Sequence, residues 1–537
     1  MKELFGILNI KSTVTYSVNT GKKQKKYYSF KSFDGETRKV SFPSVTPNSY
    51  DNNIYVAIMD DEIGQNDELR SNEQPNKHNE IGTLSRFLGV CKNRKDDMNF
   101  WLNVYGLQPP SNKHISKQPM KLLDVFNHVI RDQCHFNTFS IDNSDTIDID
   151  DACSIRDNKL YVHIALVAYR LNEPLYEYAK NQMFTVYTEN SKISMIPNNI
   201  SQELSLKENE ERLAMTFEYD IIKNQYINLQ DVKDFNKVWE NSSNSPNSIN
   251  DIIDLKFNSV YISKIINNKK YSYQEFDNKN INPQTLNIIE VIKNKYSHKL
   301  FNTEMNSKQF VECLMILVNY TTSDLIFKYY DKSIVKQYND EWNGSLSRNR
   351  DSHLSVISNS SLLYDYIPDA VINFHNYLDC NYKGSKFVIS ETNDGYAQIT
   401  SPIRRFMDII NQELIMNVLL KIENKDVLTY TMDYIIEKIN DKSKNIKRFY
   451  KKKKYLQIYY NLKGKFDVGE DVIYNGYIVA ISPEKKKYYV YIPKIDIMIK
   501  HYLKNDDNKK LFEKLKVQLV PDSKENNPYN MINFVLV

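Results

Sequence analysis

Cysteine is scarce in this chain of 537 residues, which contains five cysteines, at positions 91, 134, 153, 313 and 380. Zinc sites and disulfide-framed domains use cysteines at short, paired spacings, and no two of these positions are paired in that way. The spacing therefore argues against both classes of protein. It fits a chain that folds in a reducing compartment.

Long apolar runs and a strong net charge are also missing. No run of about twenty consecutive apolar residues occurs, and the first residues, Met1–Leu4, lack the apolar core of a signal peptide. We therefore expect a cytoplasmic protein without a membrane segment. The 71 basic residues nearly balance the 67 acidic ones, for a net charge of +4. Any nucleic-acid-binding surface must then be local.

One short segment, Ser140–Ser154, is unusually acidic. Five aspartates fall within ten of its residues, with no basic residue among them, at positions 142, 145, 148, 150 and 151. Such carboxylates repel one another unless a divalent cation or strong donors neutralise them, and Mg²⁺ and Mn²⁺ prefer hard oxygen ligands of this kind. An EF-hand is excluded because its turn glycine and distal glutamate are missing. The alternative is a solvated acidic loop.

A second segment, Tyr396–Asp408, combines a predicted helix start with two adjacent arginines. Ser401 can cap the helix and Pro402 fits its first position, so we expect a helix from Ile403 onward. A helix start offers free backbone N–H groups, and arginine offers a planar fork for phosphate. Carboxylates plus arginine suit phosphodiester cleavage. The alternative for Arg405 is an ordinary ion pair with Asp408.

These two segments resemble the signatures of the ribonuclease II/ribonuclease R exoribonucleases, the RNB family. The first family motif has the form I-D-P-x-x-x-x-D-x-D-D-A, and Ile141–Ala152 matches it with Asn143 in place of proline. The second has the form Y-x-H-x-T-S-P-I-R-R-Y-x-D, and Tyr396–Asp408 matches it with Gln398 for histidine and Phe406 for tyrosine.

The resemblance extends over roughly residues 135 to 420 and has two further departures. Leu166 replaces the aspartate that usually follows the strand after the first motif. No glutamate occurs between Glu437 and Glu470, where the family has a helix glutamate that helps to hold RNA near its 3′ end.

The resemblance implies a hydrolytic 3′→5′ exoribonuclease that releases nucleoside 5′-monophosphates from single-stranded RNA. It also implies roles by motif position. Asp150 would be the carboxylate most closely linked to chemistry, and Arg404 would stabilise charge on the phosphate, with Arg405 in support. Tyr187 would stack on bases. The implied ligands of Mg²⁺ or Mn²⁺ are Asp142, Asp148, Asp150 and Asp151.

The predicted fold class is α+β multidomain, with a mixed α/β RNB catalytic domain flanked by OB-fold barrels. We expect an RNA-binding, cold-shock-like region over residues 1–110, the catalytic domain over 111–463 and a closing barrel over 464–537. A reduced second N-terminal barrel is expected at Gly82–Tyr105. The catalytic domain would end in a long helix, Tyr430–Leu462, whose run of four lysines is either solvated or a phosphate track.

Two other functions remain open from the sequence. One is a catalytically silent RNB-type scaffold that binds RNA, which Gln398, Leu166 and the missing helix glutamate allow. The other is a nuclease that prefers DNA, because metal–carboxylate chemistry does not distinguish the sugars. For the exoribonuclease we expect a monomer that takes single-stranded RNA as its partner.

Overall fold

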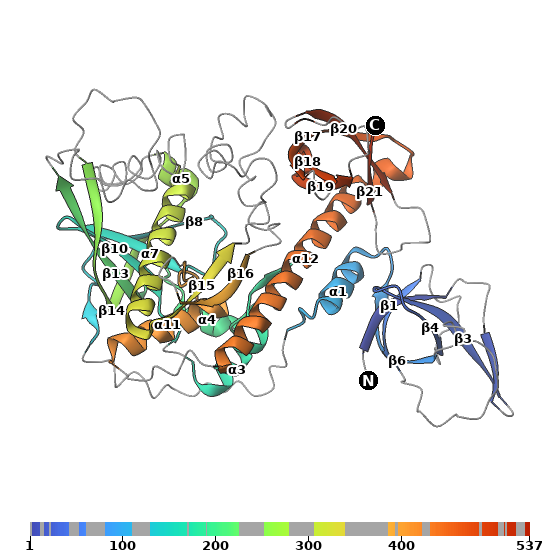
Figure 1. The fold of residues 1–537 in the computed structure, drawn as a ribbon, viewed down its shortest axis with the longest axis horizontal. Coiled ribbons are helices and arrows are strands. Elements are labelled where there is room, and N and C mark those ends of the chain that lie inside the picture. The colour runs from blue at the N-terminus through green and yellow to red at the C-terminus, as the bar shows by residue number, and fades with distance from the viewer. Residues whose placement is uncertain are drawn as a thin grey trace. The chain divides into compact units, whose positions relative to one another are not determined.

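The computed structural model describes the chain in segments and divides it into two compact units (Figure 1). The larger unit is Pro109–Lys442, and the smaller one combines Met1–Gln108 with Ser443–Val537. The predicted boundaries after residues 110 and 463 stay predictions. The described residues are 3–10, 16–20, 23–41, 53–60, 81–109, 129–168, 171–189, 191–224, 252–278, 306–338, 385–391, 396–421, 430–482, 486–502, 510, 513–521 and 532–537.

The larger unit is built on a six-stranded mixed sheet in the order β13-β10-β9-β8-β14-β7. A further pairing between β13 and β14 closes five of these strands into a ring. The strand β10 is buried on both faces, and its buried imidazole, His163, is hydrogen-bonded to Ser154 and Thr216. The strands are β7 (Arg131–Asp132), β8 (Thr138–Asp142), β9 (Asp151–Arg156), β10 (Lys159–Ala165), β13 (Glu211–Asn224) and β14 (Ile252–Ser272).

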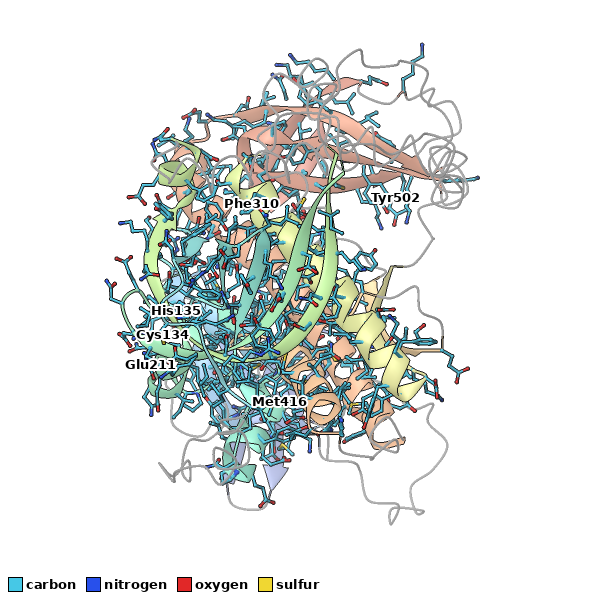
Figure 2. All side chains as sticks on the ribbon, turned by 90° about the vertical axis from the view of Figure 1, so that its left-hand side faces the viewer. Cys134, His135, Glu211, Phe310, Met416 and Tyr502 are labelled. Atoms are coloured by element: carbon cyan, nitrogen blue, oxygen red, sulfur yellow. The ribbon has the colours of Figure 1, made fainter. Side chains whose placement is uncertain are left out.

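Helices and two short ribbons pack against this sheet. Side chains of α7 and α11, among them Phe310 and Met416 (labelled in Figure 2), belong to one continuous apolar core with the sheet. The helix α11 is buried nearly all round, which its apolar sequence allows. The elements are α3 (Glu173–Gln182), β11 (Val186–Tyr187), β12 (Lys192–Ile193), α4 (Asn198–Leu204), α5 (Tyr273–Asp277), α7 (Ser307–Tyr330), β15 (Ser333–Tyr338), β16 (Ser385–Ser390) and α11 (Phe406–Leu419).

Within the described part of the chain, one segment is long and apolar enough to cross a membrane by length and composition alone, Phe310–Tyr330 of α7. The same test is passed by core helices. Phe310, Leu314 and Val318 are buried in the core of the larger unit, and Asn319 among them is hydrogen-bonded. The segment therefore has the contacts of a core helix.

The N-terminal strands form a barrel with OB topology. The barrel closes in the order β1-β3-β4-β6-β5, in which each strand pairs with the next and β5 pairs back with β1. The pair of β4 and β6 is parallel. The predicted reduced second barrel is wrong, because β6 completes the first barrel and α1 (Arg94–Val104), capped by Asn93, follows it. The strands are β1 (Glu3–Asn9), β2 (Tyr16–Thr20), β3 (Lys23–Ser32), β4 (Thr37–Ser41), β5 (Ile54–Asp60) and β6 (Ile81–Val90).

The C-terminal strands repeat the OB order, without a closing pair among the described residues. The predicted helix end at Leu462 is wrong, because α12 (Tyr430–Asp467) ends near Gly469, whose φ is +73°. The elements are β17 (Val472–Ser482), β18 (Lys487–Ile492), η6 (Pro493–Ile495), β19 (Ile497–Tyr502), β20 (Lys514–Pro521) and β21 (Ile532–Leu536).

Within the smaller unit, the lysine run of α12 has structural contacts. The Lys452 ammonium lies 4.5 Å from the ring centre of Trp101 on α1, and burial lowers its pKa to about 8. Lys454 pairs with Asp496 of the C-terminal barrel. Neither a solvated helix nor a phosphate track describes these two residues. They dock α12 onto its neighbours.

Candidate active site

The acidic segment forms the connection between two neighbouring strands. Asp142 is the last residue of β8 and Asp151 the first of β9, so the sheet brings them to the same edge. The loop between them is fixed by its backbone, because the Ala165 N–H donates to the Asp150 carbonyl at 2.8 Å. Lys270 on β14 donates to the carbonyls of Ser144 and Thr146 at 3.2 and 2.7 Å.

The arginine segment meets this loop through Asp150. The Ile403 N–H donates to one oxygen of the Asp150 carboxylate at 2.9 Å, and Arg404 Nε donates to the other at 3.3 Å. Asp150 is 5% exposed, whereas the Arg404 side chain keeps 47% of its surface exposed. The predicted helix start at Ile403 is wrong, because residues 402–404 form a turn and α11 begins at Phe406. The N–H that a helix start would leave free is used by Asp150.

Arg405 lies in a different environment. Its Nη2 donates to Asp408 at 2.6 Å and to Thr400 Oγ1 at 3.3 Å. Asp408 is fully buried and also accepts the Ser401 N–H at 2.7 Å. The ion pair considered from the sequence is therefore present, although it is internal and holds the turn together. A direct contact of Arg405 with RNA stays a prediction.

Tyr187 lies on the ribbon of β11 and β12, and 41% of the residue's surface is exposed. The ribbon is attached to the arginine segment, because the Thr185 N–H donates to the Arg404 carbonyl at 3.0 Å. Burial raises the pKa of the Tyr187 hydroxyl, and the charges of Arg404 and Asp150 act on it as well. The structure thus brings Tyr187, Arg404 and Asp150 into one centre, as the sequence predicts.

The buried carboxylates of the centre are hard to ionise. Burial raises the pKa of Asp150 to about 7 although the Arg404 charge opposes the rise, and it raises the pKa of Asp142 to about 6. The pKa of Asp151 is raised well above its usual value by burial and by the charges of Asp142 and Asp150. Asp148 is paired with Lys192. A cation placed among these groups would favour their charged forms.

Three positioning contacts escaped the sequence prediction. Asn319 on α7 accepts the Ile399 N–H at 2.9 Å, and its amide donates to Tyr396 at 2.9 Å. Gln412 on α11 accepts the N–H of Val167 at 3.1 Å, which joins α11 to the end of β10. Nothing in the local sequence distinguishes Gln412 from a surface glutamine.

The carboxylates of this centre are possible ligands for a divalent cation. Among the described residues, no three His, Cys, Asp or Glu side chains come together in an arrangement that could already hold a metal ion. The chemistry of the donors nevertheless fits one, because Asp142, Asp150 and Asp151 are hard-oxygen ligands whose mutual repulsion a cation would relieve. The fit is one of ligand type and charge.

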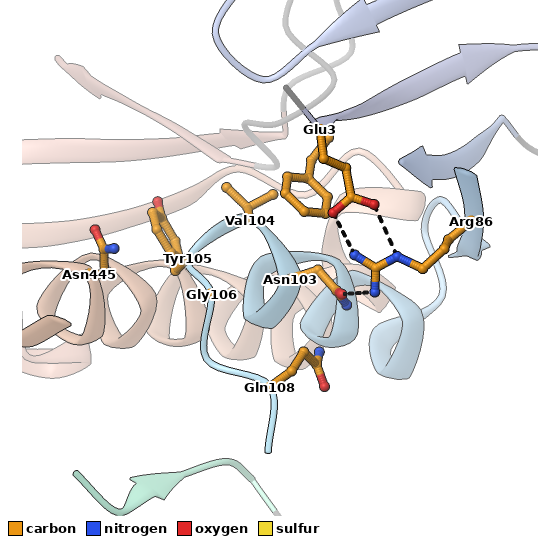
Figure 3. Close-up of a pocket in the computed structure, with 9 residues that line it drawn as sticks. Glu3, Arg86, Asn103, Val104, Tyr105, Gly106, Gln108 and Asn445 are labelled. Atoms are coloured by element: carbon orange, nitrogen blue, oxygen red, sulfur yellow. Dashed lines mark hydrogen bonds and ion pairs between the residues drawn. The ribbon is translucent and has the colours of Figure 1, made fainter. Parts of the chain in front are cut away.

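A separate hollow of about 470 Å³ lies in the smaller unit, between β1, β6, α1 and α12 (Figure 3). Arg86, the cationic residue that lines it, donates to both carboxylate oxygens of Glu3 at 3.2 and 2.9 Å and to Asn103 Oδ1 at 3.4 Å. The charge of the arginine is therefore compensated within the wall. None of the predicted site residues lines this hollow.

Comparison with known proteins assigns the chain to a family. A family model described as the RNB domain matches residues 130–421, and the chain belongs to this family. Ribonuclease R of Buchnera aphidicola subsp. Acyrthosiphon pisum is 25% identical over 432 residues, which are 70% of this chain and 58% of that protein. The chain spans about half the length of the curated relatives it matches.

Solved structures with the same fold include an apo form of Mycoplasma genitalium RNase R and yeast Ssd1, a pseudonuclease. The first has a TM-score of 0.68 at 16% identity and covers 100% of this chain and 89% of its own. The second has a TM-score of 0.65 at 12% identity, covering 98% and 70%. These matches establish the fold, and the predicted RNB domain with flanking OB barrels is confirmed.

Proposed function

We propose that the chain is a hydrolytic exoribonuclease that degrades single-stranded RNA from its 3′ end to nucleoside 5′-monophosphates. The observation that supports this most directly is the meeting of the two motifs at Asp150. This buried carboxylate accepts hydrogen bonds from Ile403 and Arg404 and so orients a guanidinium that stays about half exposed. An oriented, exposed arginine can grip two phosphate oxygens.

Each residue of the centre has a role in this proposal. Arg404 stabilises the charge that develops on the scissile phosphate, while Asp150 and Ser401 fix its orientation. Tyr187 stacks on a base near the 3′ end. Asp142, Asp148, Asp150 and Asp151 are the residues that would hold Mg²⁺ or Mn²⁺. Such an ion, when bound, lowers the pKa of the attacking water and polarises the phosphate.

The C-terminal barrel offers a surface that can hold RNA. Across β18 and β19, Lys487 pairs with Tyr502 and Tyr489 pairs with Lys500, so that ammonium groups and rings alternate on one face. The Lys500 ammonium lies 4.7 Å from the ring centre of Tyr502. Rings that stack on bases, interleaved with charges that follow phosphates, suit single-stranded nucleic acid. The neighbouring Tyr491 is fully buried and donates to Asp496 instead.

The test is incubation of the purified chain with single-stranded RNA and DNA labelled at the 5′ or the 3′ end. With Mg²⁺, we expect 3′-labelled RNA to release labelled mononucleotide at once and 5′-labelled RNA to shorten stepwise, and we expect EDTA to stop both. Equal cleavage of DNA would show that the sugar is not selected. Internal fragments would contradict an exonuclease.

A silent RNA-binding scaffold is the second candidate. The observation that favours it is that two of the four motif aspartates, Asp148 and Asp150, already pair with basic side chains. RNA that is bound but left intact in both Mg²⁺ and Mn²⁺ would support the scaffold. A cytoplasmic location and a monomeric state stay predictions.

A further inference from the structure

The helix α11 is apolar along most of its length, yet two adjacent amides, Asn411 and Gln412, are fully buried in it. We propose that these two amides are positioning residues, which hold Asp150 and the arginine segment in register without contacting RNA themselves. This inference rests on the proposed function for the reaction that the centre performs. Neither amide belongs to either motif.

Gln412 holds the backbone that follows β10. Its Oε1 accepts the N–H groups of Val167 and Ala168 at 3.1 and 3.2 Å, and its Nε2 donates to the Ala165 carbonyl at 2.8 Å. One planar amide thus satisfies three backbone groups, which neither a carboxylate nor an apolar side chain of the same length can do. The side chain of Leu166, in the middle of this backbone, is buried in the apolar core and has no acceptor to offer.

The same backbone holds Asp150. The Ala165 N–H donates to the Asp150 carbonyl at 2.8 Å, while Gln412 holds the carbonyl of Ala165. The Asp150 carboxylate in turn accepts hydrogen bonds from the Ile403 N–H and from Arg404 Nε. A shift of the end of β10 relative to α11 would therefore move Asp150 relative to Arg404.

Asn411 holds the arginine segment from the same helix. Its Nδ2 donates to the Gln398 carbonyl at 2.7 Å, and about one turn earlier on α11 Asp408 accepts the Ser401 N–H at 2.7 Å. Buried polar groups cost stability unless they are hydrogen-bonded, so a helix that is rotated or shifted in the core would leave these groups unpaired. The polar side chains of α11 thus select one arrangement of the two segments that form the centre.

The experiment measures the binding of single-stranded RNA and its single-turnover cleavage at saturating enzyme. Gln412→Met removes three contacts at nearly constant size, and Asn411→Leu removes one. Misplacing reacting groups by about 1 Å can cost roughly 100-fold, so we expect Gln412→Met to lower the rate by roughly 10- to 100-fold and Asn411→Leu by less. RNA affinity should stay within about twofold of the wild-type value, because neither amide reaches the surface.

Hydrogen exchange followed by mass spectrometry gives a readout that does not depend on activity. In Gln412→Met, the backbone N–H groups of Val167 and Ala168 lose their acceptor and should exchange faster than in the wild type. The N–H of Ala165, which bonds to Asp150, should follow if the end of β10 shifts. A lower global stability alone would not confine the change to this segment.

Asn440→Leu is the matched control. Asn440 also binds backbone with its amide, since it accepts the Phe387 N–H at 2.7 Å and donates to the Phe387 carbonyl at 2.9 Å. Phe387 lies on β16, which carries no residue of the centre. The control should lower the melting temperature without slowing cleavage at saturating enzyme.

Thermal unfolding verifies that each variant is folded, and Asn411→Leu decides alone if Gln412→Met is not. A wild-type rate in folded Gln412→Met, unchanged exchange at residues 165–168, or an equal loss of rate in Asn440→Leu would overturn the inference. In each of these cases the proposed nuclease would stand, because the wild type still cleaves RNA. A wild type that binds but never cleaves RNA would reject the proposed function, and the inference with it.

Discussion

Asp150 in the larger unit and Asp97 in the smaller unit are both buried aspartates, and they differ in what surrounds them. Burial raises the pKa of Asp150 to about 7 and that of Asp97 to about 6. Asp150 accepts from a backbone N–H and from an arginine that faces solvent. Asp97 accepts from Tyr55 at 2.8 Å, from Tyr460 at 2.5 Å and from the Lys92 N–H at 3.1 Å, all within the protein.

The comparison shows that burial and a raised pKa do not by themselves identify a catalytic carboxylate. Asp97 joins the barrel strand β5, its own helix α1 and the long helix α12. Its hydrogen bonds therefore stabilise the fold of the smaller unit. Asp150 orients a group that remains available to a substrate. The larger unit is therefore where we expect chemistry, and the smaller unit is where we expect RNA to be held.

Asp150→Asn should have the largest effect. The amide keeps an acceptor for the Ile403 N–H but loses the charge, and it can present an NH₂ group to Arg404 Nε. We expect the single-turnover rate on labelled RNA to fall by about 10²- to 10³-fold, with little change in RNA affinity. Asp157→Asn, at an exposed aspartate paired with Arg156, is the control. A wild-type rate for Asp150→Asn would remove the distinction between the two aspartates.

Arg404→Lys tests the fork itself. Lysine keeps the charge but cannot donate to Asp150 and to two phosphate oxygens together, so we expect a loss of about 2–3 kcal/mol in the chemical step, or roughly 30- to 150-fold. Arg156→Lys is closely matched, because Arg156 is similarly exposed and also pairs with an aspartate. If RNA affinity falls while the single-turnover rate holds, Arg404 binds substrate without stabilising the transition state.

Asp97 should affect the pH dependence of the protein's stability rather than the rate of RNA cleavage. Its pKa in the folded state is above the unfolded value, so its contribution to stability is complete below about pH 4 and is lost as the pH rises through about 6. Relative to Asp97→Asn, the wild type should lose about 2 kcal/mol of unfolding free energy between pH 4 and 7. The titratable groups that interact with Asp97 are Asp96, Cys91, Tyr55, Tyr459 and Tyr460.

Denaturant unfolding of the full chain at several pH values, followed by the fluorescence of its three tryptophans, measures this difference. Tyr460→Phe sharpens the test, because it removes a hydroxyl that stabilises the ionised Asp97. The variant should therefore be less stable than the wild type at neutral pH. Parallel pH profiles for the wild type and Asp97→Asn would show that Asp97 does not titrate in this range.

The sequence could predict Asp150 with Arg404 because each lies in a dense pattern of chemically related residues. It could not predict Asp97 or Lys192, whose partners come from distant strands and helices with no local pattern. The helix start was misplaced because the N–H groups of Ser401 and Ile403 bond to Asp408 and Asp150, which is a tertiary effect. α12 runs past Gly464 because Leu462 and Phe466 pack onto the C-terminal barrel. This packing outweighs the low helix propensity of glycine.

The smallest effect concerns the surface of the C-terminal barrel. Lys500 is exposed on β19 beside Tyr502 in the smaller unit, whereas the predicted metal ligands belong to the larger unit. If its ammonium contacts a phosphate, Lys500→Ala should weaken the binding of single-stranded RNA by less than roughly tenfold and lower the slope of log affinity against log salt by about 1. The single-turnover rate at saturating enzyme should not change. Lys328→Ala on α7, an exposed lysine paired with Asp324, is the control. An unchanged salt slope would place the RNA elsewhere, and a slower chemical step at saturation would show that the two units do not divide binding from chemistry.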